Sequence, residues 1–591
     1  MSAGERESCR VSRVACLVVA VVVAAGLLQL AFRLRELQVD DAAEYGYASA
    51  RQSIRRVQIG GTRGRILDRR GVLLADNRPS LSVACRPAVF QRRTWEATVD
   101  AIEAAISNAA RTVGRPSPLS RKTIRRHVNQ TLAMPLAVWL DIGVDELARF
   151  SERANEHPGF FVLETEERIY PQGSLAAHLV GMVGRDRGEA TEGDEKYNFF
   201  SPELRGRAGL EHYYNSFLRG VSGERKVLVD ARGFAIREWV VSEPRKGLDL
   251  RLTLDSNLQR TVELQLRGLS GACAVVDPRN GDVLALASAP GFNPNEFVPV
   301  LRSELYSRYS SDPRKPLLNR AVGGAYAPGS TFKPVIALAA LTAGVPAELT
   351  YDCTGVFRLG QMRLRCASRW GHGSLDMRHA LMKSCNPYFC NLGLDIGTNA
   401  IQVAASAFGF GEKTGIDFGI DMSGTVPDAD WKMRMYGEKW FLGDVAQMSI
   451  GQGMLLVSPL QMALAAGAIG TGFRVTPRLK ADLPVTRTPL PFKAEHLAVV
   501  REGMRLVVAG DGESRGTGWR GGVGVPVSVS GKTGTAEIGR GATRRKNTWF
   551  IAYAPSEAPT VALALIVENG ESGGVTAAPK AAEILREAFR K

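Results

Sequence analysis

Residues 14–32 restrict the fold of this chain more than any other segment, because they hold no charged residue over nineteen positions. The run, VACLVVAVVVAAGLLQLAF, is about long enough to cross the hydrocarbon core of a bilayer as one helix. Three arginines precede it and two follow it, so the positive-inside bias toward a cytoplasmic N-terminus is weak. No second run of comparable length follows. We predict a single anchor at residues 14–32, a cytoplasmic segment at residues 1–13, and nearly all of the chain outside the membrane.

A cleaved signal peptide is the alternative interpretation of this run. The apolar region of a signal peptide is usually about 7 to 15 residues long and ends near a small-x-small cleavage site. The sequence RLRELQVDDAAEYG, which follows the run, offers no obvious site of that kind. We therefore expect an anchor that stays on the protein.

The remainder of the chain is long enough for more than one domain, since 591 residues exceed what one hydrophobic core usually serves. A hydrophobic content of 45% and a charged content of 23% are ordinary for folded protein and argue against long disorder. The net charge of +15 is scattered, without a basic motif that has interleaved aromatic residues, so nucleic acid is not an expected partner. An anionic membrane surface or an acidic cell-wall polymer suits an anchored protein better.

Residues 33–245 are rich in arginine and in short mixed segments, which favours an extended pedestal domain. RGRILDRRGVLLADN predicts two short strands around a turn at Arg70 and Gly71. GRAGLEHYYNSFLRG has apolar residues at helical spacing and predicts a helix that ends at Gly220.

The composition changes near Gly247, and residues 246–591 predict an α+β domain with a central antiparallel sheet flanked by helices. LDLRLTLDSNLQRTVELQL reads as a strand and then a helix that Asp255 or Ser256 can cap. ACAVVDPRNGDVLALASAP predicts a hairpin that turns at its Asn-Gly pair. NTWFIAYAP and TVALALIVEN predict an antiparallel pair before a last helix from about Thr576. We expect VPVSVSGKTGTAE, residues 525–537, to be the middle strand.

APGSTFKP, residues 327–334, directly precedes the apolar run VIALAAL and predicts a helix that begins at Ser330. Lys333 then lies one turn later on the same face. A serine hydroxyl is a poor nucleophile until a base takes its proton, and a desolvated lysine can be that base. Amides at a helix N-terminus would stabilise an oxyanion beside Ser330. Taken alone, the pattern has an alternative interpretation, a capping serine followed by a surface lysine.

Two later segments make the capping interpretation improbable. KSCNPYF supplies Ser384 and Asn386. SGKTGTAE, on a predicted strand, supplies Lys532, Thr533, Gly534 and Thr535. The order S-x-x-K, S-x-N, K-T-G is that of the penicillin-recognising serine acyltransferases.

The chain resembles the class B penicillin-binding proteins, the membrane-anchored D,D-transpeptidases of bacterial cell-wall synthesis. The resemblance covers almost everything after residue 14, through RGRILDRRG, GRAGLEHYYN, PLLNRAVGGAYAPGSTFKP, SIGQGMLLVSPLQMA, SGKTGTAE and NTWFIAYAP. It implies that Ser330 is acylated by the penultimate D-Ala of a peptidoglycan stem peptide, whose D-Ala-D-Ala end loses the terminal D-Ala. An amine of a neighbouring stem peptide then forms the cross-link.

The resemblance also implies roles for the motif residues. Lys333 would be the base for acylation, while Ser384 and Asn386 would relay the proton and hold the substrate amide. Lys532, Thr533 and Thr535 would bind the substrate carboxylate or line the strand side of the cleft. The backbone amides of Ser330 and Thr535 would form the oxyanion hole, and Gly534 would let the substrate approach the strand closely.

Within class B, RIYPQGSLAAHLVGMVG resembles the rod-shape elongation enzyme more than the septal division enzyme, which stays the alternative. The resemblance implies a single-pass protein of the bacterial inner (cytoplasmic) membrane with its catalytic domain in the periplasm. It implies a polytopic membrane glycosyltransferase and the elongation machinery as partners, and covalent inhibition by β-lactams.

Four of the eight cysteine and seven histidine residues in the chain form the pattern C-x12-C-x5-H-x12-C: Cys353, Cys366, His372 and Cys385. Three thiolates and one imidazole suit a structural tetrahedral zinc ion, and some elongation-type relatives carry zinc in this stretch. A disulfide between Cys353 and Cys366 is the first alternative, and unrelated thiols are the second. The expected chemistry at Ser330 needs no cofactor.

Other functions share parts of this pattern. A secreted β-lactamase has the three motifs but is normally a single domain without an anchor or a long pedestal. A D,D-carboxypeptidase performs the same first step and differs in its acceptor, water. A β-lactam sensor usually has several membrane spans, and a pure scaffold would not depend on Ser330.

Overall fold

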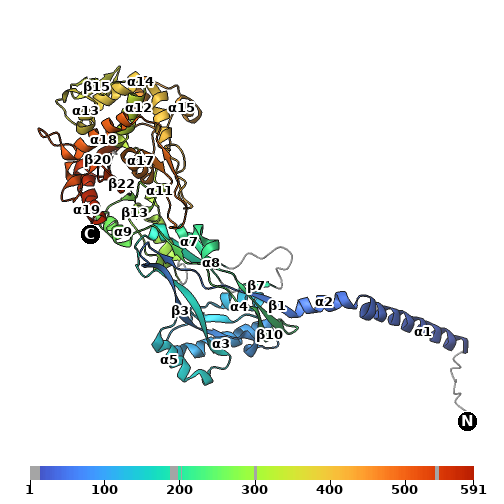
Figure 1. Cartoon of the computed structure of the whole chain (residues 1–591). Helices are drawn as coiled ribbons and strands as arrows, with labels where there is room; N and C mark the ends of the chain where they lie inside the picture. The colour runs from blue at the N-terminus through green and yellow to red at the C-terminus, as the bar shows by residue number, and fades with distance from the viewer. Residues whose placement is uncertain (1–12, 187–197, 201–202, 299–302, 540–544, 591) are drawn as a thin grey trace, which may run out of the picture.

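The computed structural model of the chain describes residues 13–186, 198–200, 203–298, 303–539 and 545–590. Its elements run from an N-terminal helix at one end, through a pedestal, to a larger domain at the other end (Figure 1). Helix α1 (Arg13–Arg35) continues through a π-helical turn (Glu36–Asp40) toward α2 (Ala42–Ser53). The predicted segment at residues 1–13 lies outside the described residues except for Arg13.

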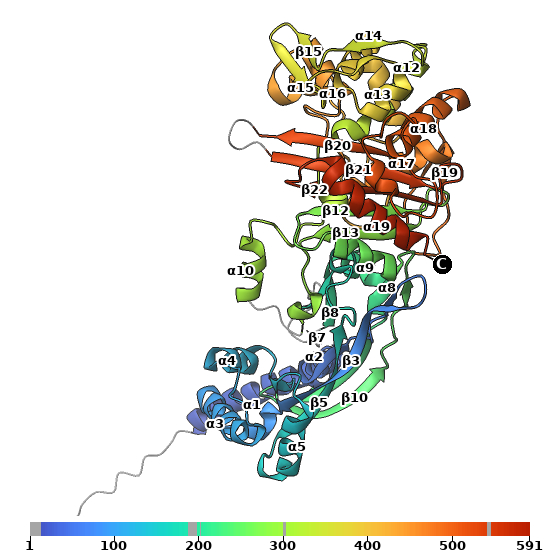
Figure 2. The same ribbon diagram turned by 90° about the vertical axis from the view of Figure 1, so that its left-hand side faces the viewer.

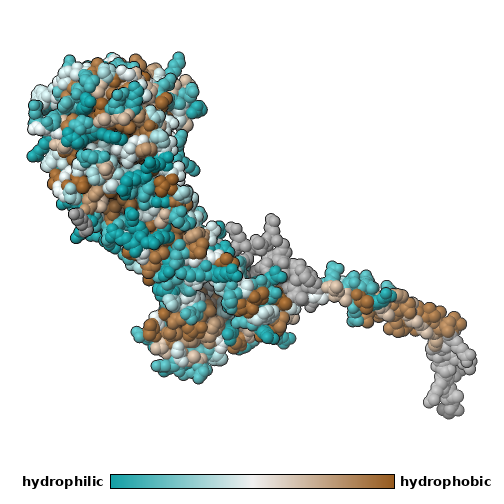
Figure 3. All heavy atoms as spheres, in the orientation of Figure 1, coloured by the Kyte–Doolittle hydropathy of each residue, from teal (hydrophilic) through white to brown (hydrophobic). Residues whose placement is uncertain are grey.

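The N-terminal helix is long and apolar enough to cross a membrane over Val14–Asp40, and none of its most apolar window is buried inside the protein. In Figure 3 it forms an apolar rod that projects from a surface of mixed polarity. A helix that is apolar on all sides and is not buried by the rest of the protein needs an apolar surrounding.

The described part of the pedestal contains two larger sheets, in the orders β10-β9-β1-β7 and β11-β2-β3-β4, with β5 paired to β3, and a two-stranded sheet of β6 and β8. Its strands are β1 (Ile54–Ile59), β2 (Ile66–Leu67), β3 (Leu73–Cys85), β4 (Leu136–Trp139), β5 (Phe160–Ile169), β6 (Met182–Asp186), β7 (Asn198–Phe200), β8 (Glu203–Ala208), β9 (Gly223–Val229), β10 (Ala235–Ser242) and β11 (Leu250–Arg251). Its helices are α3 (Trp95–Val113), α4 (Arg121–Gln130), α5 (Val144–Glu152), α6 (Ala177–Val180), α7 (Gly209–Tyr213) and α8 (Asn215–Arg219). The predicted strands around Arg70 and Gly71 are β2 and β3. The predicted helix before Gly220 is divided into α7 and α8 at Tyr214.

A buried ion cluster joins three distant segments of the pedestal. The Glu211 carboxylate accepts from Arg63 Nε at 2.6 Å and from Arg168 Nε at 2.7 Å, and the three side chains are at most 3% exposed. Burial alone would raise the pKa of Glu211, but the two guanidinium groups hold it below its usual value. The cluster therefore stays ionised and fixes the two arginine-bearing strand regions to α7.

The larger domain is built on one antiparallel sheet in the order β13-β12-β22-β21-β20. Its strands are β12 (Gly271–Val276), β13 (Val283–Ala289), β20 (Ser530–Ile538), β21 (Arg545–Ala554) and β22 (Val561–Glu568). Helices α9 (Ser256–Gln265) and α19 (Ala578–Ala588) lie against one face of this sheet (Figure 2), and their apolar side chains pack with those of the sheet. Apolar side chains of α12 (Lys333–Thr342) and α17 (Pro459–Thr471) cover the other face.

The other elements of this domain form its outer lobes. They are α10 (Ser303–Ser311), α11 (Arg320–Gly323), β14 (Tyr351–Cys353), β15 (Val356–Leu359), β16 (Met362–Arg365), β17 (Gly373–Leu375), α13 (Met377–Lys383), α14 (Asn386–Ala407), α15 (Ala429–Tyr436), α16 (Leu442–Ser449), β18 (Phe473–Val475), β19 (Arg487–Pro489) and α18 (Ala494–Ala509).

The predicted α+β sheet, assembled from both ends of the domain, is confirmed. Asp255 caps α9 as expected, through bonds from the amides of Asn257 and Leu258. The expected middle strand is wrong, because β20 lies at the edge and β22 is in the middle. Every residue of β22 except its last is buried, whereas β20 ends in two exposed residues, Glu537 and Ile538. Polar residues at 530, 532, 533 and 535 suit a strand with one free edge.

We expect Glu211→Ala to destabilise the pedestal by about 3 to 5 kcal/mol, because it leaves two buried guanidinium groups without their carboxylate. Chemical denaturation of the full-length protein in detergent measures this free energy of unfolding. The control is Glu238→Ala, which removes an exposed partner of Arg225 and should cost about 0 to 1 kcal/mol. Equal effects of the two substitutions would contradict the importance of the buried cluster.

Candidate active site

Ser330 lies in a 3-10 turn, Gly329–Phe332, that leads directly into α12. The helix begins at Lys333 rather than at Ser330, and Pro334 occupies its first turn as predicted. Gly329 has a φ of +56°, and a Cβ there would lie 2.9 Å from the carbonyl oxygen of Thr535 on β20. Glycine is therefore required where the turn approaches the edge strand.

Lys333 is fully buried and points at the second motif. Its Nζ lies 2.8 Å from the Ser384 carbonyl oxygen, 2.7 Å from Asn386 Oδ1 and 3.5 Å from Ser384 Oγ. Ser384 ends α13 with a φ of +56°, so the chain turns sharply before α14 and presents both polar side chains to the lysine. Burial lowers the pKa of Lys333 to about 8. An amine with such a pKa can accept a proton near neutral pH.

Lys532, on the edge strand β20, contacts the same hydroxyl. Its Nζ donates to Ser384 Oγ at 2.8 Å and to the Thr533 carbonyl oxygen at 3.1 Å, and its side chain is fully buried. Burial, together with the charge of Lys333, lowers the pKa of Lys532 well below its usual value. The Ser384 hydroxyl thus lies between two amines and can pass a proton between them.

The predicted substrate strand carries the three remaining motif residues. The Thr533 hydroxyl is bonded to the Thr517 hydroxyl at 2.9 Å, and the Thr535 hydroxyl accepts from the Gly573 amide at 3.3 Å. Gly534 packs against the turn before Ser330. The structure thus brings all three motifs together, while the roles assigned to their residues stay predictions.

Two contributors to the site were not found from the sequence. Thr517 holds Thr533 and also donates to the Met382 carbonyl oxygen at 3.2 Å. The Gly451 carbonyl oxygen accepts from the Gly329 amide at 2.8 Å and so holds the turn that carries Ser330. The two glycines of SIGQG, residues 449–453, could have indicated a tight turn at the second contact.

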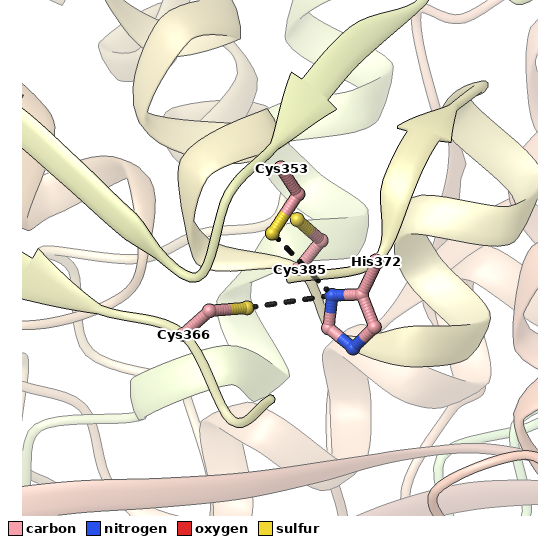
Figure 4. A group of neighbouring side chains, drawn as sticks. All are labelled: Cys353, Cys366, His372 and Cys385. Carbon is pink, nitrogen blue, oxygen red and sulfur yellow. Dashed lines mark hydrogen bonds between the residues drawn. The ribbon is translucent and has the colours of Figure 1, made fainter. Parts of the chain in front are cut away.

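The four predicted metal ligands come together in one cluster beside the second motif (Figure 4). Their ligand atoms all lie within 4.8 Å of one another. His372 Nδ1 is 3.6 Å from Cys353 Sγ and 3.5 Å from Cys366 Sγ. Ligands about 2.0 to 2.3 Å from a tetrahedral zinc ion lie about 3.4 to 3.8 Å apart, so these two distances fit the ion. The hydrogen bond between Cys385 and Cys366 lowers the pKa of the Cys366 thiol and raises that of the Cys385 thiol, so in the absence of an ion Cys366 is the favoured thiolate of this pair.

The cluster is built from elements that surround the second motif. Cys353 ends β14, Cys366 follows β16, His372 precedes β17, and Cys385 caps α14 between Ser384 and Asn386. In the structure Cys353 and Cys366 are free thiols, each directed at the histidine. A metal ion held here would fix the loop that carries the second motif.

The α+β domain combines K-T-G on an edge strand, S-x-x-K where a buried turn leads into α12, and S-x-N in the turn before α14. This combination defines a penicillin-recognising serine acyltransferase. The chain belongs to the penicillin-binding proteins: residues 58–252 match the Penicillin-binding Protein dimerisation domain and residues 271–586 match the Penicillin binding protein transpeptidase domain. The presence of both domains, with relatives that align along most of the chain, confirms the class B prediction.

Curated relatives and solved structures agree with this membership. The chain is 33% identical to Peptidoglycan D,D-transpeptidase MrdA of Acinetobacter baumannii over 93% of this chain and 84% of the relative. It is 32% identical to the Escherichia coli K12 protein of the same name over 91% of this chain and 88% of the relative. The PBP2 chain in the complex with MreC from Helicobacter pylori has a TM-score of 0.77 and 26% identity, with 91% and 98% of the two chains covered. PBP2 of Pseudomonas aeruginosa has a TM-score of 0.66 and 27% identity, with 91% and 97% covered.

Gly534→Ala is expected to slow acylation by penicillin about 10- to 100-fold, since small displacements at a reacting centre have effects of this size. The added methyl would lie 2.9 Å from both the Pro328 carbonyl oxygen and Thr331 Cγ2, and would push β20 away from the turn of Ser330. The measurement is the second-order rate constant of labelling by a fluorescent penicillin. Gly291→Ala is the control, because a methyl there has no neighbour within 4 Å. Unchanged labelling of the Gly534 variant would contradict the tight approach of strand and turn.

Proposed function

We propose that the protein is a serine-type peptidoglycan D,D-transpeptidase that cross-links stem peptides during cell-wall elongation. The observation that carries this proposal is the Ser384 hydroxyl between two fully buried lysine amines, beside the turn of Ser330. The curated relatives that align along most of the chain carry the name peptidoglycan D,D-transpeptidase, which supports the same reaction.

In the proposed reaction the donor stem peptide lies along the free edge of β20. The Ser330 hydroxyl loses its proton to the neutral amine of Lys333 and attacks the carbonyl carbon of the penultimate D-Ala. The backbone amides of Ser330 and Thr535 stabilise the oxyanion. The proton then passes through the Ser384 hydroxyl to the leaving amine of the terminal D-Ala. An acyl ester on Ser330 remains, and the amine of a second stem peptide attacks it and restores the serine.

Lys532 has a separate part in this proposal. Its amine holds the Ser384 hydroxyl at 2.8 Å, and any positive charge on it faces Lys333. Burial and the charge of Lys333 disfavour a proton on Lys532, so the two amines are not charged together. A bound carboxylate of the terminal D-Ala would favour the charge on Lys532 and leave Lys333 neutral. The residue therefore supports both proton abstraction and substrate binding.

We further propose that α1 anchors the protein in the bacterial inner membrane, with the catalytic domain in the periplasm. Partners of the elongation machinery, including a polytopic glycosyltransferase, would assemble along the anchor and the pedestal. Two solved relatives support this assignment by their titles: the PBP2–MreC complex of Helicobacter pylori and a peptidoglycan synthase complex that coordinates polymerization and crosslinking. The second has a TM-score of 0.71 and 28% identity, with 97% and 98% of the two chains covered.

The Cys353, Cys366, His372 and Cys385 cluster is proposed to hold a structural zinc ion. The ligand distances and the donor set support it, and a closed four-ligand site leaves no open position for catalysis. Bound zinc would supply rigidity to the loop between β14 and α14, while the chemistry is performed by serine and lysine.

We expect Ser330→Ala to abolish covalent labelling of the full-length protein by fluorescent penicillin, because no other group replaces the acylated oxygen. Mass analysis after incubation with a stem-peptide donor and an acceptor then separates cross-linking from hydrolysis. A product released only by water would instead assign a D,D-carboxypeptidase. Labelling of the variant at the wild-type level would contradict acylation at Ser330.

Protein purified without chelator is expected to contain about one zinc ion per chain by elemental analysis. Cys366→Ser should lose the metal and lower the thermal midpoint, because the ion stabilises only the folded chain. The matched control is Cys390→Ser, a buried thiol that lies outside the cluster and should keep the metal. Metal-free protein with Cys353 bonded to Cys366 would contradict the zinc site.

A further inference from the structure

The β15–β16 hairpin has two chemically different faces. Cross-strand pairs place Arg358 opposite Arg363 and Val356 opposite Arg365, so the three arginines share one face. The other face carries Phe357, Leu359, Met362 and Leu364, of which Phe357 is part of the core and both leucines pack against it. The apolar face therefore attaches the hairpin to the domain and leaves the arginine face exposed.

The arginine face has a charge that the protein itself does not compensate. Arg358, Arg363 and Arg365 are all exposed. Along the described part of the chain, none of the three forms an ion pair, although many other arginines do. Two like charges directly opposite each other on a sheet are destabilising. An arrangement that costs stability and offers several planar guanidinium groups suits a carboxylate ligand, which arginine can bind through two hydrogen bonds.

The hairpin borders the catalytic centre. The Arg365 carbonyl oxygen accepts from Asn386 Nδ2 at 2.8 Å, and the Oδ1 of the same amide accepts from Lys333 Nζ at 2.7 Å. Lys532 of β20 contacts the same motif at Ser384, so the second motif contacts both the hairpin and the edge strand. If the donor peptide lies along β20, the acceptor stem peptide can approach the centre along the hairpin.

The position of the hairpin also decides which anion can reach it. In Figures 1 and 2 the β15 hairpin lies at the end of the molecule farthest from α1, with the pedestal between them. Lipid headgroups around the anchor cannot contact it. Stem peptides of the cell wall, which carry free carboxylates, can reach the distal end.

We propose that Arg358, Arg363 and Arg365 bind a free carboxylate of the acceptor stem peptide and thereby direct its amine toward the acyl ester on Ser330. This inference rests on the proposed transpeptidase function. The arginines would be positioning residues for the second half of the reaction, since acylation by the donor does not involve them.

The test uses the full-length protein in detergent, a thioester donor that acylates Ser330, and a synthetic acceptor tripeptide with free carboxylates. Arg358→Gln combined with Arg363→Gln is expected to raise the acceptor concentration for half-maximal aminolysis about tenfold, the effect of losing one strong charged hydrogen bond. Labelling by fluorescent penicillin should stay at the wild-type rate. For the wild type, amidation of the acceptor carboxylates should raise the half-maximal acceptor concentration about tenfold. For the variant, the amidated and the free acceptor should have the same half-maximal concentration.

The matched control removes two exposed charges from the pedestal helix α4, through Lys122→Gln and Arg126→Gln, and should leave the preference for the free carboxylate intact. Replacement of the two hairpin arginines by lysine should restore part of it. A hairpin variant that keeps the full preference for the free acceptor over the amidated one would overturn the inference. An effect of the glutamine substitutions on the donor concentration needed for acylation, rather than on the acceptor concentration, would also overturn it. Slow penicillin labelling in both the glutamine and the lysine variants would do the same. Loss of labelling in the unmodified protein would contradict the transpeptidase function itself.

Discussion

Two lysine amines buried on one serine hydroxyl form the constraint on which the rest of this structure depends. Lys333 and Lys532 are fully buried, and their recorded partners are oxygens of serine, asparagine and threonine rather than carboxylates. Burying cations in this way costs free energy, and the chain offsets it with a large apolar core on both faces of one sheet. The pKa of each amine falls because charge is unfavourable there. The burial that costs stability therefore also gives an amine that can accept a proton near neutral pH.

The pedestal continues into the catalytic domain through paired backbone as well as through a linker. The pedestal strand β11 pairs in parallel with β2, with Leu250 beside Ile66, and the residue after β11, Leu252, forms a backbone bridge with Lys480 of the larger domain. Glu211 also holds Arg63, which lies just before β2, and Arg168 near the end of β5. Covalent connection, strand pairing and a buried ion cluster therefore act together where the two regions meet, and they determine the direction in which the catalytic head extends from the anchor (Figure 1).

The sequence could predict the parts of the site that depend on local chemistry. Ser330 and Lys333 are recognisable because a proline-glycine break, a helix start and an apolar run occur together, and the Cys and His cluster because its residue types are rare here. Strand order could not be predicted from each segment alone, because β12 and β22, which pair with one another, lie far apart in the sequence. The polar residues of β20 were an available signal for an edge strand. Thr517 also escaped notice, because a threonine in a glycine-rich loop has no pattern that separates it from an ordinary turn residue.

The free edge of β20 has a consequence for inhibition. A ligand that extends the sheet at this edge is recognised through main-chain amides and carbonyls, and these remain in place whichever side chains mutate. Escape from such a compound would require bending the backbone, which also carries Lys532 and adjoins Gly329. A compound that binds side-chain pockets alone can lose affinity when a single side chain is substituted. Antibiotics designed as an additional strand would therefore leave resistant variants few routes that keep the enzyme working.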